Sequence, residues 1–252
     1  MPPEIALVVF ACVFSGAVLG MWLRTRLPED HLTEGARDAV RLAMGLIATM
    51  TALVLGLVTA SAKSSYDAQS DAIKHTAARI LLLDRMLANY GPETRDARAL
   101  LRKLVEDRID AIWPEDRFRR VKLDAPEVAF AGQEIEGRIL QLSPQNDVQR
   151  WLRSRALAIG EDITETRWLM LSGPGTSVSG PFLVVVVFWL TIIFGSFGVF
   201  APRNGTVIGG LFLCAVSVAG AMLLILEMDQ PFHGLMKISS APMRYALSHL
   251  GQ

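Results

Sequence analysis

Hydrophobic residues are concentrated in four long runs, two near each end of the chain, with a charged segment between the pairs. The runs cover residues 5–23, 42–62, 182–200 and 206–226, and none contains a charged residue or a histidine. A helix needs about 20 residues to cross the hydrocarbon core of a bilayer. Buried helices of a globular protein are the alternative, but these are seldom apolar all round for so long. The pattern therefore predicts a polytopic membrane protein with four transmembrane helices, two plus two.

The second run continues as a helix beyond the predicted membrane boundary. From Thr33, a candidate N-cap, to Tyr90 the chain has no proline, and Gly91-Pro92 then ends the helix. Apolar residues keep helical spacing after the polar residues that follow Ala60. They are Ile73, Ala77, Ile80 and Leu87, with Leu81 and Leu83 beside them. The sequence predicts one helix of roughly fifty residues, about 80 Å long, that enters a soluble domain.

Three further helices are expected in the soluble segment. One follows Pro92 and ends at Trp113-Pro114, one covers residues 126–142, and the last begins at Ser143-Pro144 as N-cap and first turn. The first buries Ala97, Leu100, Leu101, Leu104, Val105, Ile109 and Ile112, and the last repeats at Leu152, Ala156, Ile159, Ile163 and Met170. Residues 172–180, rich in Gly and Ser, predict a hinge into the third span.

Strand signals are nearly absent, so the predicted fold class is all-α. The expected organisation is a first transmembrane helix pair (1–62), a helical extramembrane domain (63–178), a second transmembrane pair (179–229) and an amphipathic C-terminal segment (230–252). In that last segment Ser240 and Pro242 predict a helix that lies along the membrane interface or against the soluble helices.

Charge excludes one class of partner. The chain has 25 basic and 25 acidic residues, and residues 63–172 hold 18 of each, so no net field attracts nucleic acid. Cys12 and Cys214 both lie in apolar runs, and no disulfide framework is indicated. Residues 1–23 lack a basic n-region and a small-residue cleavage site, which favours a retained first span over a signal peptide.

One face of the second run has an unusual composition. Small or hydroxyl-bearing residues recur at steps of four and three, and the series ends in a cation: Gly45, Thr49, Ala52, Gly56, Thr59 and Lys63. Small residues allow close helix approach in lipid, so packing is one interpretation. The other is a pore-lining face repeated around an oligomer axis. Shorter small-residue stripes in the third run (Thr191, Gly195, Gly198) and the fourth (Gly209, Gly210, Ser217, Gly220, Ala221) predict packing surfaces.

Few other residues suggest chemistry. Glu227 and Asp229 follow the fourth run directly and are candidates for a pore mouth or an ion-binding site, although ordinary interfacial placement also explains them. The basic run Arg117, Arg119, Arg120 and Lys122 is flanked by acids and indicates a solvated loop rather than a lipid or ligand site. No HExxH motif, Cys/His cluster or phosphate loop is present, so we expect no enzyme, no metal and no cofactor.

Two segments resemble a known family. GLIATMTALVLGLVTASAKSSYD (residues 45–67) and EMDQPFHGLMKIS (227–239) are similar to the second-span signature and the segment after the last span of an uncharacterised bacterial membrane family labelled bestrophin-like. The resemblance implies an oligomeric ion channel with four spans per subunit, second-span helices around a central pore, and commonly five subunits. It also implies placement in the bacterial inner membrane.

Three functions remain in competition. The first is an oligomeric ion channel or pore, a homo-oligomer whose partners are membrane lipid and the permeating ion. The second is a non-conducting scaffold or sensor in which the long helix relays a state between the soluble domain and the bilayer. A transporter ranks third, because no run contains an ionisable group that could couple a transport cycle to an ion gradient.

Sidedness rests on two conflicting counts. The loops between paired runs carry Arg24, Arg26, Arg37, Arg41 and Arg203, against Lys237 and Arg244 in the C-terminal segment. This count places the soluble domain in the periplasm. Adding Lys63, Lys74, Arg79 and Arg167 of the soluble segment to the second count reverses the comparison. The family resemblance also implies a cytoplasmic domain. The first loop usually sets orientation, so we favour the periplasm.

Overall fold

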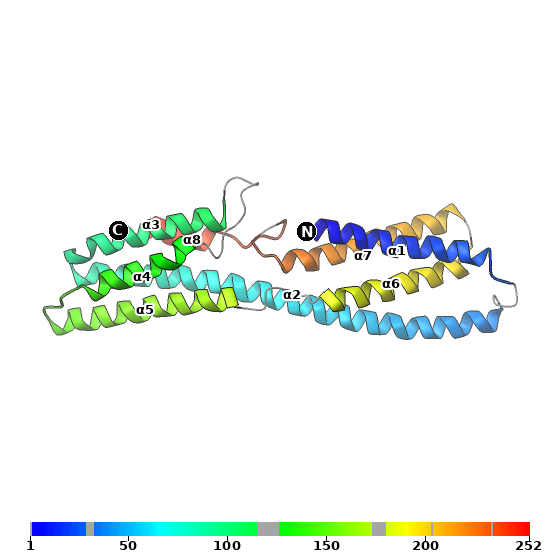
Figure 1. Cartoon of the computed structure of the whole chain (residues 1–252), viewed down its shortest axis with the longest axis horizontal. Helices are drawn as coiled ribbons and strands as arrows, with labels where there is room; N and C mark the ends of the chain where they lie inside the picture. Colours follow the sequence, from blue (N-terminus) through cyan, green and yellow to red (C-terminus); the bar gives the residue numbers. More distant parts are fainter. Residues whose placement is uncertain (1, 29–32, 115–125, 173–179, 203, 233) are drawn as a thin grey trace. The chain divides into compact units, whose positions relative to one another are not determined.

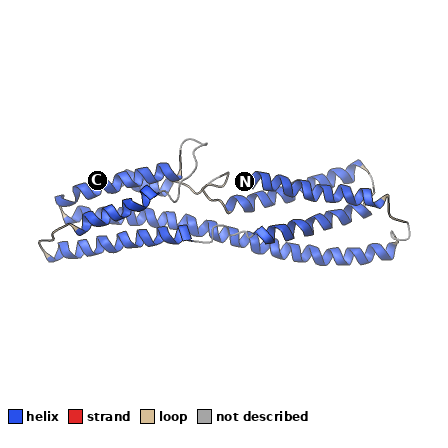
Figure 2. Cartoon of the chain, viewed as in Figure 1, coloured by secondary structure: helices blue, strands red, loops and turns tan. Residues whose placement is uncertain are grey.

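The computed structural model describes residues 2–28, 33–114, 126–172, 180–202, 204–232 and 234–252. All regular structure within these ranges is helical, which confirms the all-α prediction (Figure 2). The basic run at residues 117–122 and most of the expected hinge lie outside the described residues.

The four apolar runs form four helices that are long and apolar enough to cross a membrane: α1 (Pro2–Arg24), α2 (Glu34–Tyr90), α6 (Gly180–Phe200) and α7 (Gly205–Met228). The predicted long second helix is confirmed, because α2 is a single helix of 57 residues. The remaining elements are a short 3-10 helix η2 (Pro92–Thr94), α3 (Arg95–Ile112), α4 (Pro126–Leu140), α5 (Asp147–Ser172) and α8 (Ala241–His249). The α-helices are labelled in Figure 1.

The chain divides into two compact units. The first, here called the membrane unit, consists of residues 1–66, 176–230 and 234–236, and the second, the soluble unit, of residues 67–175, 231–233 and 237–252. Helix α2 contributes to both, with Tyr66 as its last residue in the membrane unit.

Within the membrane unit, α1 packs against α6 and α7. The contact with α6 depends on glycine. A Cβ on Gly16 would lie 2.7 Å from the carbonyl oxygen of Thr191, and a Cβ on Gly20 or Gly198 would overlap the carbonyl oxygens of Gly195 and Ala17. The backbones of α1 and α6 therefore touch directly, as small residues permit in lipid. The predicted packing role of the third-span stripe is confirmed.

The fourth-span stripe behaves differently. Gly209, Gly210 and Gly220 have no neighbouring atom within 4 Å of a built Cβ, and Ser217 and Ala221 are exposed. Among the described residues, nothing packs against these three glycines. Helix α7 instead contributes Ala215, Met222 and Ile225 to the core of the membrane unit.

The core of the soluble unit follows the predicted apolar periodicity. In α2, Ile73, Ala77, Ile80, Leu83 and Leu87 are buried. In α3 the buried residues are Ala97, Leu101, Val105, Ile109 and Ile112, whereas Leu100 and Leu104 are partly covered. Helix α8 packs against α3 through a buried face that includes Met243 and Ala246, so the C-terminal helix lies against the soluble helices, one of the two predicted positions.

An ion pair anchors the end of the chain to this core. Asp84, only 4% exposed, accepts from Arg98 Nε at 2.7 Å and from Arg98 Nη2 at 2.9 Å. Hydrogen bonding to Asp84 raises the pKa of Arg98. The same carboxylate accepts from the amide of Gly251 at 3.3 Å, and Arg102 Nη1 donates to the carbonyl oxygen of Leu250 at 2.8 Å. A buried carboxylate is thus fully compensated by a guanidinium and a backbone amide.

The predicted start of the last soluble helix was wrong. Helix α5 begins at Asp147 rather than at Ser143-Pro144. Asn146 Oδ1 accepts from the amide of Gln149 at 2.8 Å, and the Gln149 side chain accepts from the amide of Gln145 at 2.7 Å. Gln149 also donates through Nε2 to the carbonyl oxygen of Tyr90, the last residue of α2, at 3.0 Å. Asn146 therefore caps the helix in place of Ser143, because its side chain accepts from the amide of the N3 residue Gln149. The Gln149 side chain in turn fixes the residue before the cap, Gln145.

The glycine contact between α1 and α6 leads to a stability prediction. Gly198→Ala should lower the free energy of unfolding by about 1–3 kcal/mol, because the added methyl group forces the two backbones apart. Gly209→Ala is the matched control, since its Cβ meets no atom and alanine favours the helix. Thermal unfolding of both variants in detergent measures the difference. Equal melting temperatures would show that the close approach of α1 and α6 contributes nothing.

Candidate functional site

The membrane part of α2 has three distinct faces. At about 100° per residue, they are centred roughly 120° apart. The first face packs inside the chain through Thr51, Val54, Leu55, Val58 and Ala62, of which Thr51 and Ala62 are buried. The second is the small-residue stripe, and the third carries large apolar residues: Leu46, Met50, Leu53 and Leu57. Within the part of the chain that the structure describes, only the first of these faces is covered.

The small-residue stripe is open. Gly45, Thr49, Ala52, Gly56 and Lys63 are exposed, and Thr59 is partly covered. No atom lies within 4 Å of a built Cβ on Gly45 or Gly56. These two glycines therefore have no packing role within one chain, in contrast to Gly16, Gly20 and Gly198. All six predicted pore-lining residues lie on one face of α2, and five of them are exposed.

Hydroxyl groups of the stripe are oriented by their own helix. Thr49 Oγ1 donates to the carbonyl oxygen of Leu46 at 2.8 Å, and Thr59 Oγ1 donates to that of Leu55 at 2.7 Å. Each hydroxyl proton is thereby satisfied, while the oxygen keeps lone pairs that can accept from water. From Gly45 to Thr59 the stripe consequently offers hydrogen-bond acceptors but no formal charge. The first charged residue of the stripe is Lys63. The Lys63 ammonium lies 5.7 Å from the ring centroid of Tyr66, one turn further along α2.

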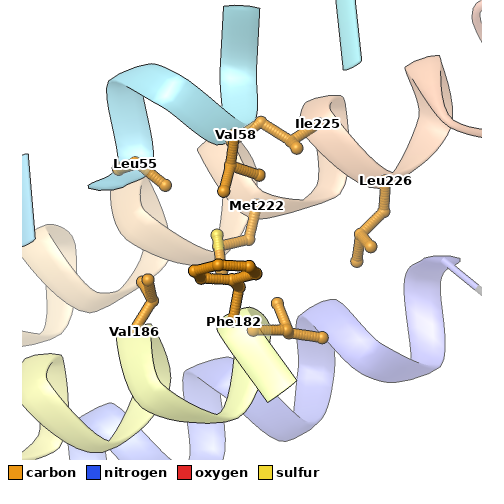
Figure 3. A pocket seen from close by; sticks show the side chains of 8 residues that line it. Leu55, Val58, Phe182, Val186, Met222, Ile225 and Leu226 are labelled. Atoms are coloured by element: carbon orange, nitrogen blue, oxygen red, sulfur yellow. The ribbon is translucent and has the colours of Figure 1, made fainter. Parts of the chain in front are cut away.

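A small crevice lies where α2 meets α6 and α7 (Figure 3). Its lining is entirely apolar and consists of Leu55, Val58, Phe182, Leu183, Val186, Met222, Ile225 and Leu226. Side chains of all three helices converge on it, with the Phe182 ring next to Met222 in Figure 3. Without a polar group it can bind no ion, and it belongs to the packed face of α2.

Glu227 organises the chain reversal after α7. Its side chain is buried, with 4% exposure, and Oε2 accepts hydrogen bonds from the amides of Leu235 and Met236, the latter at 3.4 Å. Gly234 makes this possible, because its φ of 80° is left-handed and any Cβ there would overlap the carboxylate. The carboxylate of Glu227 therefore already holds a turn of backbone, which is a structural role that the sequence did not reveal.

Asp229, the second carboxylate predicted near the pore mouth, is the C-cap residue of α7 and is partly covered. Among the described residues no group of three or more His, Cys, Asp or Glu side chains could hold a metal ion. Whether Asp229 meets a permeating ion stays a prediction.

Two structural features escaped the sequence analysis. One is the Glu227–Gly234 turn, and the other is a set of buried or partly buried charged residues in the soluble unit, namely Asp84, Arg108 and Arg167. A signal existed for the second set, because each of these residues lies within an apolar stripe of its helix. The sequence signal for the turn was weaker, because Glu227 and Gly234 have the composition of an ordinary polar loop.

Comparisons with known proteins agree on one family. A family model described as the bestrophin-like domain matches residues 11–243. Among curated proteins, none shows significant sequence similarity to the chain. Two solved structures are similar in fold. One is a bacterial bestrophin homologue from Klebsiella pneumoniae that carries a point mutation, at 12% identity and a TM-score of 0.67, covering 98% of this chain and 99% of that one.

The other is a variant described only as a membrane protein, at 12% identity and a TM-score of 0.66, with the same coverage of both chains. At this identity the two structures support the fold alone, whereas the family model spans nearly the whole chain and includes both segments that carried the resemblance. This multi-pass membrane protein belongs to the bestrophin-like family.

Proposed function

We propose that the protein is an oligomeric ion channel or pore in which α2 helices from several copies surround a common axis. One observation carries the proposal. Only 6% of the most apolar window of α2 is buried within the chain, against 33% for α1 and 22% for α6 and α7. A membrane helix with two uncovered faces, one of them small and hydroxyl-bearing, is suited to contacts with other copies and with water. Membership of the bestrophin-like family supports the same function.

The choice between the two open faces follows from solvation. The face with Leu46, Leu53 and Leu57 is compatible with lipid or with an apolar neighbour. The stripe from Gly45 to Lys63 offers hydroxyl oxygens and small side chains. Both lower the free energy of a hydrated ion that passes along this face. We therefore assign the stripe to the axis and the large apolar face to lipid or to the adjacent subunit.

A non-conducting scaffold or sensor is the competing function, and it also uses the long helix α2. The two differ in one observable property. Purified protein in planar bilayers passes current if it is a channel and none if it is a scaffold.

Assembly through α2 can be tested by crosslinking. With Cys12 and Cys214 replaced, a single cysteine at Thr49 or Ala52 should form covalent dimers between subunits, because both positions are exposed on the stripe. A cysteine at Ala62 is the control, since that residue is fully buried within one chain and should not crosslink. A monomer in both mild detergent and lipid would refute the assembly.

The lining assignment predicts an asymmetry in conductance. Gly56→Leu and Thr59→Leu should reduce single-channel conductance more than Leu53→Ala and Leu57→Ala, because bulk added at the axis narrows the path. Recordings from the four variants in planar bilayers make the comparison. Larger effects from the leucine truncations would assign the axis to the large apolar face, and equal effects would remove the stripe from the path.

The sidedness that we propose rests on basic residues at one end of the membrane unit. Arg24 Nη1 donates to the carbonyl oxygen of Ala201, and the Arg37 guanidinium lies 5.9 Å from the ring centroid of Phe200. The end of α1, the start of α2 and the end of α6 thus share one end of the membrane unit, where arginine is concentrated. By the positive-inside rule we assign this end to the cytoplasm and the segment between α2 and α6 to the periplasm.

Thiol labelling tests this orientation. In a variant without Cys12 and Cys214, a cysteine placed at the exposed Gln145 should react with a membrane-impermeant reagent in intact cells stripped of their outer membrane. A cysteine at Arg26 is the matched control and should react only after lysis. The reverse pattern would place the soluble unit in the cytoplasm.

A further inference from the structure

The segment after α7 alternates between the two units. Residues 231–233 belong to the soluble unit, residues 234–236 to the membrane unit, and residues 237–252 to the soluble unit again. We call residues 231–232 and 234–238 the strap. Two anchors hold the strap, and the contacts of each anchor lie within a single unit.

The first anchor holds the strap in the membrane unit through Glu227. The buried carboxylate accepts from the amides of Leu235 and Met236 through one oxygen. Gly234 has the positive φ that brings the backbone so close to this oxygen. The side chain of Met236 also packs against the hydrophobic core of the same unit. Because hydrogen bonds to a carboxylate are stronger than neutral ones, this anchor fixes the strap to the last turn of α7.

The second anchor holds the strap in the soluble unit through Trp113, the C-cap residue of α3. Its indole meets the ring of Phe232 edge to face, with 6.2 Å between ring centroids. Its Nε1 donates to the carbonyl oxygen of Ile238 at 2.8 Å. The amide of Ile238 donates in turn to the carbonyl oxygen of Pro231 at 2.8 Å. Phe232 and Ile238 are both buried, so this anchor is packed as well as hydrogen-bonded.

The length of the chain ties the two anchors together. The hydrogen bond between Ile238 and Pro231 closes a loop, and the residues that Glu227 holds lie inside that loop. Three residues of extended chain span at most about 11 Å, which is the reach from Phe232 to Leu235. A displacement of Trp113 and Phe232 beyond this slack must therefore break the hydrogen bonds to Glu227 or the contacts of Trp113.

We propose that the strap opens and closes as one cooperative element and transmits the conformational state of the soluble unit to α7. When it is closed, the amides of Leu235 and Met236 compensate the buried carboxylate of Glu227. When it opens, that carboxylate loses both donors, and an uncompensated buried charge is strongly unfavourable. The end of α7, which contributes Ile225 and Met228 to the core of the membrane unit, must then rearrange.

The strap offers a route between the units in addition to the continuous helix α2. Its operation does not depend on whether the protein conducts ions, because both anchors are properties of a single chain. A cooperative element makes one prediction that two independent anchors do not: weakening either anchor loosens the other.

Amide hydrogen exchange of the full chain in detergent, resolved to single residues by mass spectrometry, tests the proposal. Trp113→Phe keeps an aromatic ring beside Phe232 but removes the Nε1 donor. Exchange at Leu235 and Met236 should accelerate about three- to tenfold, the effect of losing one hydrogen bond, although both amides belong to the other unit. Trp151→Phe is the matched control, because Trp151 lies exposed on α5 in the same unit, and it should leave both rates unchanged.

The reciprocal substitution provides a second measurement. Glu227→Gln removes the charge that strengthens the membrane anchor, so exchange at Ile238 in the soluble unit should accelerate by a similar factor. Gly234→Ala should have the same effect, because its Cβ would overlap the carboxylate of Glu227. Glu34→Gln, at an exposed position of α2, is the control and should leave Ile238 unchanged.

The exchange pattern in Trp113→Phe decides between one element and two. Faster exchange at Ile238 with native rates at Leu235 and Met236 would show independent anchors and overturn the proposal, even if Glu227→Gln or Gly234→Ala failed to fold. Equal acceleration throughout α6 would indicate general destabilisation in place of coupling and would overturn it too. Acceleration confined to the strap and the end of α7 is the expected result.

Discussion

The direct backbone contact between α1 and α6 is the interaction on which the membrane unit depends. Gly16, Gly20 and Gly198 let the two helices approach until their carbonyl oxygens occupy the space that side chains would fill. Helix α7 packs against α1 as well, and these three helices form most of the core. Because lipid is as apolar as leucine, this close contact rather than hydrophobic burial holds them together. The same arrangement leaves α2 with a single covered face.

The uncovered faces of α2 connect the fold to the proposed function. In a water-soluble protein, a helix with so little burial would be charged on its outside, but here the outside is apolar on one face and small with hydroxyl groups on the other. Such a helix needs lipid, another copy of the chain or a water-filled axis around it. Neighbouring backbone occupies the space beside Gly16, Gly20 and Gly198, whereas no atom within 4 Å occupies the space beside Gly45 or Gly56. This difference distinguishes packing within a chain from contacts beyond it.

Charged residues in the soluble unit illustrate two solutions to one electrostatic problem. Asp84 is buried and compensated within the chain by Arg98 and the amide of Gly251, and this pair also holds the C-terminal residues. Arg108 is partly buried in a comparable apolar stripe, its Nε is shielded from solvent, and no carboxylate among the described residues forms an equivalent ion pair with it. A buried ion pair can be nearly neutral for stability, but an isolated buried charge is strongly unfavourable. The two residues therefore differ in how far the described part of this bundle compensates their charge.

The sequence by itself determined the elements of this protein. Four spans, the continuous helix to Tyr90, the buried stripes of α2 and α3, and the family all follow from hydrophobic periodicity and local motifs, because these depend on residues close in the chain. Tertiary structure decided what those elements meet. It showed that Gly195 and Gly198 of α6 are packed and the glycines of α7 are open, that Asn146 rather than Ser143 caps α5, and that Glu227 binds the turn at Gly234. The composition of a stripe specifies how closely a neighbour can approach, but only contacts between residues far apart in sequence specify whether a neighbour is there.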